Sequence, residues 1–283
     1  MDKVSVRVPA SVSNLGPGFD CLGVGLRLYN VMAVERAAEQ QALPAVLDEA
    51  AALFFKQPRV RRFAFCCSVR ENVPRARGLG SSATVRVGLL TGLNRLAGDP
   101  LDRSQLFELA VRLEGHPDNV APASFGGFTV ARGNAVQRFA VLPRLKFVLL
   151  IPDYEVKTSQ ARKILPKQIA RLNAVESCGN ACAITAAFVS RNYELLRGSF
   201  GDGLHQPFRA RLVPYLAKVI AAAERAGAVG AFLSGSGSTI AAVTLDRPEH
   251  VARAMRRALG SAAARTAVVS ADNHGARITQ QKS

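Results

Sequence analysis

The chain has 283 residues, of which 48% are hydrophobic and 20% are charged, and its formal net charge at pH 7 is +16. These proportions indicate a globular protein of one large domain or two lobes. The sequence contains no run of 18 uninterrupted apolar residues, so a membrane-spanning helix is not expected. The 37 Lys and Arg residues are scattered, Trp is absent and aromatic residues make up only 6% of the chain, so the composition disfavours a nucleic-acid partner.

The first half of the chain contains apolar residues at the alternating spacing of strands and at the three-to-four-residue spacing of helices. We predict strands at 4–8, 28–35, 63–69 and about 126–131, and helices at 44–56, from about Ser82 to Ala97, and after a cap at Asp102 or Ser104. The N-terminal residues lack the continuous apolar segment of a signal peptide and are predicted to form a strand of the mature fold.

The apolar stretch K-F-V-L-L-I-P at 146–152 is predicted to open a second lobe. We predict further helices at 158–165, 167–190, 214–226 and 248–259, a strand–loop–strand unit at 229–243, a strand at 266–270 and a frayed polar tail after Ala271. The irregular alternation indicates an α+β protein, with an N-terminal lobe at 1–143 and a C-terminal lobe at 144–283.

Five cysteines do not make a disulfide framework, and a reducing, cytoplasmic compartment fits them best. Cys178 and Cys182 are four residues apart on a predicted helix. We interpret them as small buried residues, because no other Cys or His lies at metal-ligand spacing nearby.

The segment P-R-A-R-G-L-G-S-S-A-T at residues 74–84, which we call the glycine loop, leads directly into a predicted helix. Gly78 and Gly80 would let the backbone approach a polyphosphate closely, with the N–H groups at the helix start facing it. The alternative is an ordinary turn in which Ser81 or Ser82 caps the helix. Arg75 and Arg77 either add positive charge or are simply solvated.

Other glycine-rich or serine-based chemistries do not fit. A dinucleotide fingerprint needs a strand running straight into the turn, whereas a loop containing Pro74 intervenes here. The chain has no Gly-Lys-Ser or Gly-Lys-Thr of a Walker A loop, no protein-kinase signature, and no G-x-S-x-G around Ser81, Ser82 or Ser236. A phosphate cradle without a Walker lysine remains, with Glu114 as a candidate Mg²⁺ ligand.

At this point the chain resembles the GHMP small-molecule kinases, and among them the homoserine kinases. The glycine loop matches their P-x-x-x-G-L-G-S-S motif, and four further blocks follow the order of that family. They are V-R-V-P-A-S-V-S-N-L-G-P-G-F-D-C-L-G (6–23), L-E-G-H-P-D-N-V-A-P-A-S-F-G-G-F (113–128), H-Q-P-F-R-A-R-L-V-P (205–214) and F-L-S-G-S-G-S-T (232–239).

The resemblance implies a two-lobed GHMP kinase fold, with a left-handed βαβ crossover in the N-terminal lobe and a ferredoxin-like C-terminal lobe. It also implies ATP-dependent phosphorylation of the homoserine hydroxyl in threonine biosynthesis, with Mg²⁺, by in-line transfer. The partners would be the small molecules L-homoserine and ATP, and the family suggests a homodimer.

The matched motifs imply roles for individual residues. The nucleotide would lie on the glycine loop, which comprises Pro74, Arg75, Ala76, Arg77, Gly78, Leu79, Gly80, Ser81, Ser82, Ala83 and Thr84, and beside Gly235, Ser236 and Gly237. Ser82 and Glu114 would hold Mg²⁺ and, with Asn119, make up the catalytic set. Homoserine would contact Asn14, Asp20, His116, Asn119, Arg162 and Arg209.

Several alternatives stay open. Residues 235–237 also suit a tight turn between two buried strands, Arg211 replaces Arg209 if the register differs, and Asp118 is not assigned as a base. The stretch between Asn30 and Asn72 looks short against the family, which leaves the preferred nucleotide base undetermined. The rival functions are a GHMP kinase for mevalonate or a sugar, and a basic RNA-binding protein on a related fold.

Overall fold

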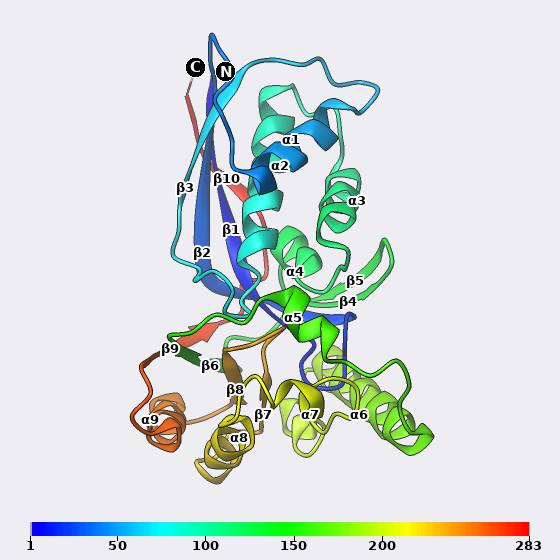
Figure 1. Ribbon diagram of the computed structural model, residues 1–283, viewed down its shortest axis with the longest axis vertical. Coiled ribbons are helices and arrows are strands. Elements are labelled where there is room, and N and C mark those ends of the chain that lie inside the picture. The colour runs from blue at the N-terminus through cyan, green and yellow to red at the C-terminus, as the bar shows by residue number, and fades with distance from the viewer. Residues whose placement is uncertain (1, 283) are drawn as a thin grey trace.

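Two antiparallel sheets, one in each lobe, organise the chain in the computed structural model, which describes residues 2–282 (Figure 1). The first sheet has the order β10-β1-β2-β4-β5, and β3 pairs with the outer part of β2. Its strands are β1 (Lys3–Ser13), β2 (Leu22–Arg36), β3 (Phe65–Arg70), β4 (Phe128–Arg132), β5 (Ala135–Phe139) and β10 (Arg277–Lys282).

Four helices cover one face of this first sheet (Figure 1). They are α1 (Ala45–Phe55), α2 (Ser81–Leu96), α3 (Arg103–Glu114) and α4 (Val120–Phe125). Alternate valines of β1, such as Val4, Val6 and Val8, are fully buried beneath the helices, as the period-two pattern predicts. Asp102 caps α3 in a complete capping box with Gln105, which confirms the first of the two predicted caps.

The second sheet has the order β7-β8-β6-β9 and is confirmed as ferredoxin-like, because β6, β7, β8 and β9 follow the β-α-β-β-α-β sequence. Its strands are β6 (Lys146–Pro152), β7 (Gly230–Leu233), β8 (Ile240–Thr244) and β9 (Ala264–Ser270). The accompanying helices are α5 (Thr158–Lys163), α6 (Arg171–Ser190), the 3₁₀ helix η1 (Tyr193–Leu196), α7 (Gln206–Arg209), α8 (Leu216–Arg225) and α9 (Pro248–Leu259).

Two expectations from the sequence are wrong. The tail after Ala271 is not frayed, because β10 pairs with β1 from Arg277 onward and returns the chain to the first sheet. Cys178 and Cys182 are exposed on α6 and not buried. No helix among residues 2–282 is long and apolar enough to cross a membrane.

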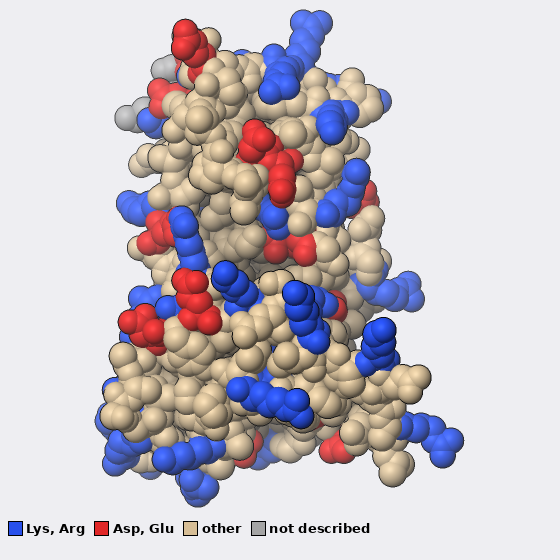
Figure 2. Space-filling model, viewed as in Figure 1, with Lys and Arg blue, Asp and Glu red and all other residues tan. Residues whose placement is uncertain are grey.

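One hydrophobic core runs through the junction of the lobes. It contains Val12 and Leu26 from the first sheet and Phe147 and Phe232 from the second. Phe128 of β4 stacks on Phe188 of α6 with 4.1 Å between ring centroids. The lobes therefore share an apolar interior, and Lys and Arg side chains are spread over both of them (Figure 2).

We predict that Phe188→Ala destabilises the protein by about 3–5 kcal/mol, because it leaves a cavity at this junction. Urea unfolding followed by far-UV circular dichroism measures the change. Val268→Ala, on an exposed part of β9, is the control and should change stability by less than about 0.5 kcal/mol. Equal losses in the two variants would contradict a shared core.

Candidate active site

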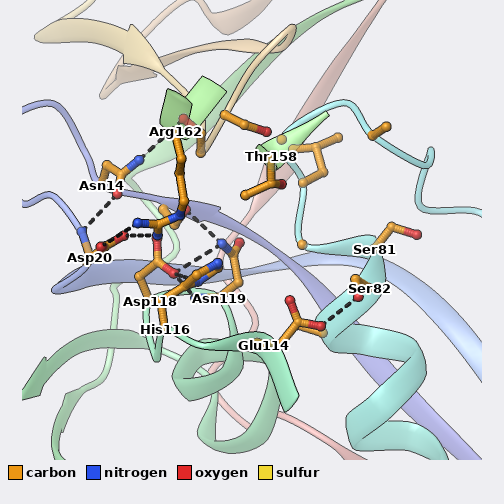
Figure 3. Close-up of a pocket in the computed structure, with 18 of the residues that line it drawn as sticks. Asn14, Asp20, Ser81, Ser82, Glu114, His116, Asp118, Asn119, Thr158 and Arg162 are labelled. Carbon is orange, nitrogen blue, oxygen red and sulfur yellow. Dashed lines mark hydrogen bonds and ion pairs between the residues drawn. The ribbon is translucent and has the colours of Figure 1, made fainter. Parts of the chain in front are cut away.

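A cavity of about 300 Å³ lies between the lobes, at the start of α2 (Figure 3). Segments far apart in the sequence meet there: the link between β1 and β2, the glycine loop, the link between α3 and α4, α5, α7 and the link between β7 and β8. The lining residues are Ser13, Asn14, Asp20, Ala76, Gly78, Leu79, Gly80, Ser81, Ser82, Ala83, Glu114, His116, Asp118, Asn119, Lys157, Thr158, Arg162, Arg209, Gly235 and Ser236.

The glycine loop forms one wall of this cavity with its backbone. Gly78 and Gly80 have φ angles of 73° and 68°, a region that residues with a Cβ atom rarely adopt. A Cβ atom at Gly78 would lie 2.1 Å from the carbonyl oxygen of Ser234, and one at Gly80 would lie 2.2 Å from Ser11 Oγ. Only glycine fits at either position.

Gly80 is the N-cap residue of α2, and no side chain caps the first turn of that helix. The alternative interpretation of this segment, in which Ser81 or Ser82 caps the helix, is therefore wrong. Because α2 begins at the cavity, its first N–H groups and the positive end of its dipole face the space, which suits an anion.

The loop's own arginines point away from the cavity. Arg75 pairs with Glu71 outside it. Arg77 donates from Nε to the carbonyl oxygen of Pro152 at 3.0 Å and forms an ion pair with Asp153 at 3.2 Å, which ties the loop to the end of β6. Pro74 and Thr84 do not line the cavity either. The cation that does lie beside the loop is Lys157, which no sequence motif had indicated.

Ser82 and Glu114 meet, as their assignment as a pair requires. Ser82 Oγ donates to Glu114 Oε1 at 2.6 Å, and Nη1 of Arg86 donates to the same oxygen at 2.6 Å (Figure 3). A hydroxyl and a carboxylate beside a phosphate-sized space are the protein ligands that Mg²⁺ usually takes. The residues present therefore fit this ion.

The link between β7 and β8 packs against the glycine loop from the other lobe. Ser234 Oγ donates to the carbonyl oxygen of Gly78 at 2.6 Å, and the N–H of Gly235 donates to that of Ser13 at 3.2 Å. Gly235 and Ser236 line the cavity, whereas Gly237 does not. The two interpretations of this motif are compatible, because it is a turn between buried strands that also borders the cavity.

Asp20 and Arg162 form a bidentate ion pair at the cavity's far side. Nη2 and Nη1 of Arg162 lie 2.6 and 3.1 Å from the two carboxylate oxygens of Asp20 (Figure 3). Asp20 has a φ angle of 58°, and its backbone N–H donates to Oδ1 of Asn14 at 3.1 Å. The two predicted substrate residues therefore neutralise each other in the free protein.

Arg209 is a buried cation with one nitrogen to spare. Its Nε donates to the carbonyl oxygen of Ala161 at 3.3 Å and its Nη1 to that of Gly235 at 2.8 Å, while Nη2 makes no hydrogen bond among residues 2–282. Burial, and then the charge of Arg162, lowers the pKa of Arg209 to about 10, so the guanidinium stays charged at pH 7. This geometry fits an anion receptor.

His205 holds Arg209 in place, a role that the sequence patterns did not indicate. Its Nε2–H donates to the carbonyl oxygen of Gly16 at 2.8 Å, so its Nδ1 is free to accept from Nη1 of Arg209 at 3.3 Å. Burial lowers the pKa of His205 to about 4, although the nearby Asp202 raises it. The ring is therefore neutral at pH 7. The ring also stacks on Phe19, over which the guanidinium of Arg209 lies.

Asn119 is fixed by three side chains. Its Oδ1 accepts from Ser11 Oγ at 2.8 Å, and its Nδ2 donates to Ser13 Oγ at 2.9 Å and to Asp118 at 3.3 Å. These bonds orient the amide of Asn119 between the glycine loop and Asp20. The signal for the two serines was their place on β1, within the first matched block.

Nδ1 of His116 and Oδ1 of Asp118 lie 2.9 Å apart in a hydrogen-bonded pair, which is an ion pair when the imidazole is protonated. Asp118 is almost fully buried, yet its bonds to His116 and to the backbone N–H of Asn119 outweigh burial and lower its pKa. Burial lowers the pKa of His116 less than its hydrogen bond and ion pair with Asp118 raise it, so the net shift is upward. Ligand atoms of Asp20, His116 and Asp118 lie within 4.8 Å of one another.

The cavity therefore has one end at the start of α2, which suits an anion, and one end lined by side chains of both charges. We call the mixed-charge set the polar cluster, and it comprises Asn14, Asp20, His116, Asp118, Asn119, Arg162 and Arg209. Thr158, four residues before Arg162 on α5, lies between the ends (Figure 3). Its spacing from Arg162, which places both on one helix face, was the available signal for it.

A second cavity of about 510 Å³ adjoins the first and shares Ala76, Ser81 and Ser82 with it. Its wall comes from residues 41–47 and 67–71 and is largely apolar, with Leu43, Val46, Leu47, Val69 and Val85. The stretch between Asn30 and Asn72 therefore builds a pocket large enough for a flat apolar group next to the glycine loop.

Comparison with known proteins shows the family. Residues 45–127 match the GHMP kinases N terminal domain, and residues 184–261 match the GHMP kinases C terminal domain. A homoserine kinase of Caldicellulosiruptor bescii is 38% identical over 300 residues, covering 97% of this chain and 96% of the relative. A homoserine kinase of Desulfitobacterium hafniense is 37% identical over 296 residues, covering 97% and 99%. This chain belongs to the GHMP kinase family.

Solved structures of GHMP kinases have the same fold as this chain. The homoserine kinase from Cytophaga hutchinsonii superposes with a TM-score of 0.91 at 26% identity, over 99% of this chain and 98% of that one. The Methanococcus jannaschii mevalonate kinase gives a TM-score of 0.72 at 14% identity, over 95% and 98%, which shows the shared fold alone. The predicted two-lobed GHMP kinase fold is confirmed.

We predict that Asp118→Asn lowers the pKa of His116 from above to below its ordinary value of 6.5, because burial and the charge of Arg162 then outweigh the charge of Asp20, the one remaining cause that raises it. NMR titration of the imidazole protons, assigned with His116→Gln, measures it, and exposed His250 is the internal reference. In the wild-type protein the pair stabilises the fold fully below pH 6.5 and loses this effect as the pH rises through the raised pKa. An unchanged His116 midpoint in Asp118→Asn would show that the carboxylate is not the cause.

Proposed function

We propose that this GHMP kinase transfers the γ-phosphoryl group of ATP to the hydroxyl of L-homoserine, giving O-phospho-L-homoserine and ADP. One observation carries the proposal: the anion-binding start of α2 and a polar cluster suited to a zwitterion share a single cavity. The identity to homoserine kinases across nearly the whole chain supports the same acceptor.

The nucleotide's phosphates would lie on the glycine loop, held by the N–H groups of Ser81, Ser82 and Ala83 and beside Lys157. The adjoining apolar cavity between Leu43 and Val85 suits the adenine ring. Ser82 and Glu114 would hold Mg²⁺, which neutralises phosphate charge when bound. In this arrangement main-chain groups and Lys157 take the place of the Walker lysine that the chain lacks.

Homoserine would lie in the polar cluster. Its carboxylate would bind the spare Nη2 of Arg209 together with Arg162, and its ammonium group would bind Asp20. The fixed amide of Asn119 belongs to the cluster and lies next to Gly80 of the glycine loop, where it would orient the hydroxyl towards the γ-phosphorus. Binding in this pose would place the acceptor in line with the donor.

The acceleration would come from positioning and from charge neutralisation around the transferred group. The hydroxyl oxygen forms the new bond to phosphorus as the bond to the ADP oxygen breaks, and the hydroxyl proton is released. We do not assign Asp118 as the base, since its buried Oδ1 already accepts from His116 and from the backbone of Asn119.

The product would feed threonine biosynthesis, and the reaction would take place in a reducing cytoplasm, which the five free cysteines support. The partners would then be the two small-molecule substrates. No nucleic acid needs to be invoked, because the cations at the cavity are accounted for by phosphates and a carboxylate.

An ADP-release assay with Mg-ATP tests the proposal against a panel of homoserine, threonine, mevalonate and galactose. Homoserine should be turned over with the highest kcat/KM, and chelation of Mg²⁺ by EDTA should abolish the reaction. Turnover of mevalonate or galactose in the absence of turnover of homoserine would overturn the assignment.

We predict that Arg209→Ala raises the KM for homoserine roughly a hundredfold while the KM for ATP changes little, because the lost guanidinium would bind the carboxylate. Arg211→Ala is the matched control, because that exposed arginine lies two residues along and does not line the cavity. Initial-rate kinetics measure both constants. A selective rise of the homoserine KM in Arg211→Ala instead would move the assignment to Arg211.

A further inference from the structure

A third cavity, of about 310 Å³, lies in the N-terminal lobe between α2, α3, the end of α4 and β10. We call it the β10 cavity. It shares no lining residue with the two cavities described above, and its elements belong to the lobe in the upper half of Figure 1. The proposed kinase reaction makes no use of it.

Most of the wall of the β10 cavity is apolar. One face of α2 contributes Val87, Leu90, Thr91 and Asn94, whose spacing of three, one and three residues places them side by side on a helix. The apolar lining residues are Val87, Leu90, Leu101, Leu106, Ala276 and Ile278. A cavity of this size and lining suits a short hydrocarbon group.

Two hydroxyl groups of this wall lack a hydrogen-bond partner within the described part of the chain. They belong to Thr91 of α2 and Ser124 of α4. Ser124 is only 5% exposed. A buried hydroxyl without a partner is unfavourable, so native structures rarely contain one unless a bound molecule satisfies it. A polar ligand atom in the β10 cavity would supply the partner.

The β10 cavity also contains a cation that no acid neutralises. Three charged residues line it, namely Asp99, Arg103 and Arg277. Asp99 is paired with Arg95, and Arg277 is paired with Asp272 at 3.1 Å. Arg103 forms no ion pair with any residue in the range 2–282. The lining of the cavity therefore carries a positive charge that is not balanced.

Arg103 keeps one nitrogen free for a ligand. Its Nε donates to the carbonyl oxygen of Ser124 at 3.0 Å and its Nη2 to that of His274 at 2.7 Å, whereas Nη1 makes no hydrogen bond among the described residues. Burial, and then the charge of Arg138, lowers the pKa of Arg103 more than the charge of Asp272 raises it. An anion bound at Nη1 would offset the repulsion between the two arginines.

We propose that the β10 cavity binds a small aliphatic monocarboxylate. The carboxylate accepts from Nη1 of Arg103 and from the hydroxyl of Ser124, whose carbonyl oxygen already holds the same guanidinium. The hydrocarbon chain lies against the apolar side chains of α2 and α3. One free guanidinium nitrogen and one hydroxyl match the two oxygens of a carboxylate, whereas a phosphate dianion would bring a second charge that a single arginine does not balance.

Methyl NMR of the full chain, with 4-methylpentanoate as the probe, tests this proposal. A carboxylate can also bind Arg209 in the candidate active site, so the signal of Ile278 in the β10 cavity is followed separately from that of Ala83 beside the glycine loop. Titration should shift the Ile278 signal with a millimolar or lower dissociation constant. The neutral isostere 4-methylpentanamide should bind roughly tenfold more weakly, and each methylene group removed should weaken binding about fourfold.

Arg103→Gln tests the contact with the anion. It should remove the preference for the acid over the amide, so that the ratio of their dissociation constants falls from roughly ten to about one. Because the readout is a ratio, a distortion that weakens both ligands equally does not change it. Arg112→Gln, which changes an exposed arginine on the same helix outside the cavity, is the matched control and should keep the preference.

Thr91→Phe tests the cavity itself, because the larger side chain fills the space beside α2. The Ile278 signal should then respond to neither probe. Thr91→Val leaves the space open and should keep the dissociation constant of 4-methylpentanoate within about threefold of the wild-type value. Thermal midpoints near that of the wild-type protein verify that both variants are folded.

Four results would overturn the proposal: no shift of Ile278 at about 10 mM probe, equal binding of acid and amide, a preference that survives Arg103→Gln, or binding that survives Thr91→Phe. In the first two cases Arg103 would only tie α3 to the end of α4. The readout is binding in a cavity apart from the candidate active site. A failure here is therefore distinguishable from a failure of the proposed kinase reaction.

Discussion

The close approach of three backbone segments at Gly78 and Gly80 is the constraint on which the site depends. A methyl group at either glycine would collide with the β7–β8 link or with β1, at 2.1 and 2.2 Å. Main-chain N–H groups cannot adjust to the position of a phosphate group in the way that a flexible lysine side chain can. Packing therefore has to place the start of α2 correctly. The missing Cβ atoms allow both lobes to fix that position, and Arg77 adds a third tie to the end of β6.

The polar cluster depends on the same junction. Its members come from the β1–β2 link, the α3–α4 link, α5 and α7, so both lobes have to contribute before the cluster exists. Burying this many charged groups is unfavourable unless each is paired or hydrogen-bonded. The pairs Asp20–Arg162 and His116–Asp118, and the two carbonyl oxygens that accept from Arg209, satisfy that requirement. The shared hydrophobic core, with Phe128 on Phe188, keeps these segments in register.

Local patterns predicted the elements well where apolar burial decides them, as for the almost fully buried strand β6 and the amphipathic helix α9, whose bounds match the expected ranges. They failed where a distant contact decides the structure. The polar segment 277–282 becomes a strand only because β1 offers an open edge, and Gly80 caps α2 because Ser11 leaves no room for a side chain. Motif resemblance found most of the residues that line the cavity. It could not show that Lys157 lines the cavity or that Arg75 and Arg77 do not. It also could not show that Arg77 is tied to the end of β6, or that buried His205 bonds to Gly16 and holds Arg209, because the contacts with β6 and Gly16 join segments of different lobes.

The ion pair between Asp20 and Arg162 gives a physical reason for the proposed acceptor. In the free protein these charges neutralise each other, and Nη2 of Arg209 has no hydrogen-bond acceptor within residues 2–282. When a zwitterionic amino acid binds, its ammonium group can pair with Asp20 and its carboxylate with Arg162 and Arg209, so every charge remains paired. Mevalonate has a carboxylate but no ammonium group. Its carboxylate would draw Arg162 away from Asp20, and no cation would then pair with Asp20. A neutral sugar would separate the pair or leave it closed across the site. Leaving one charge of a half-buried ion pair without a partner is more unfavourable than the intact pair is favourable. This site would therefore select its substrate mainly because molecules without both charges would leave Asp20 or an arginine unpaired.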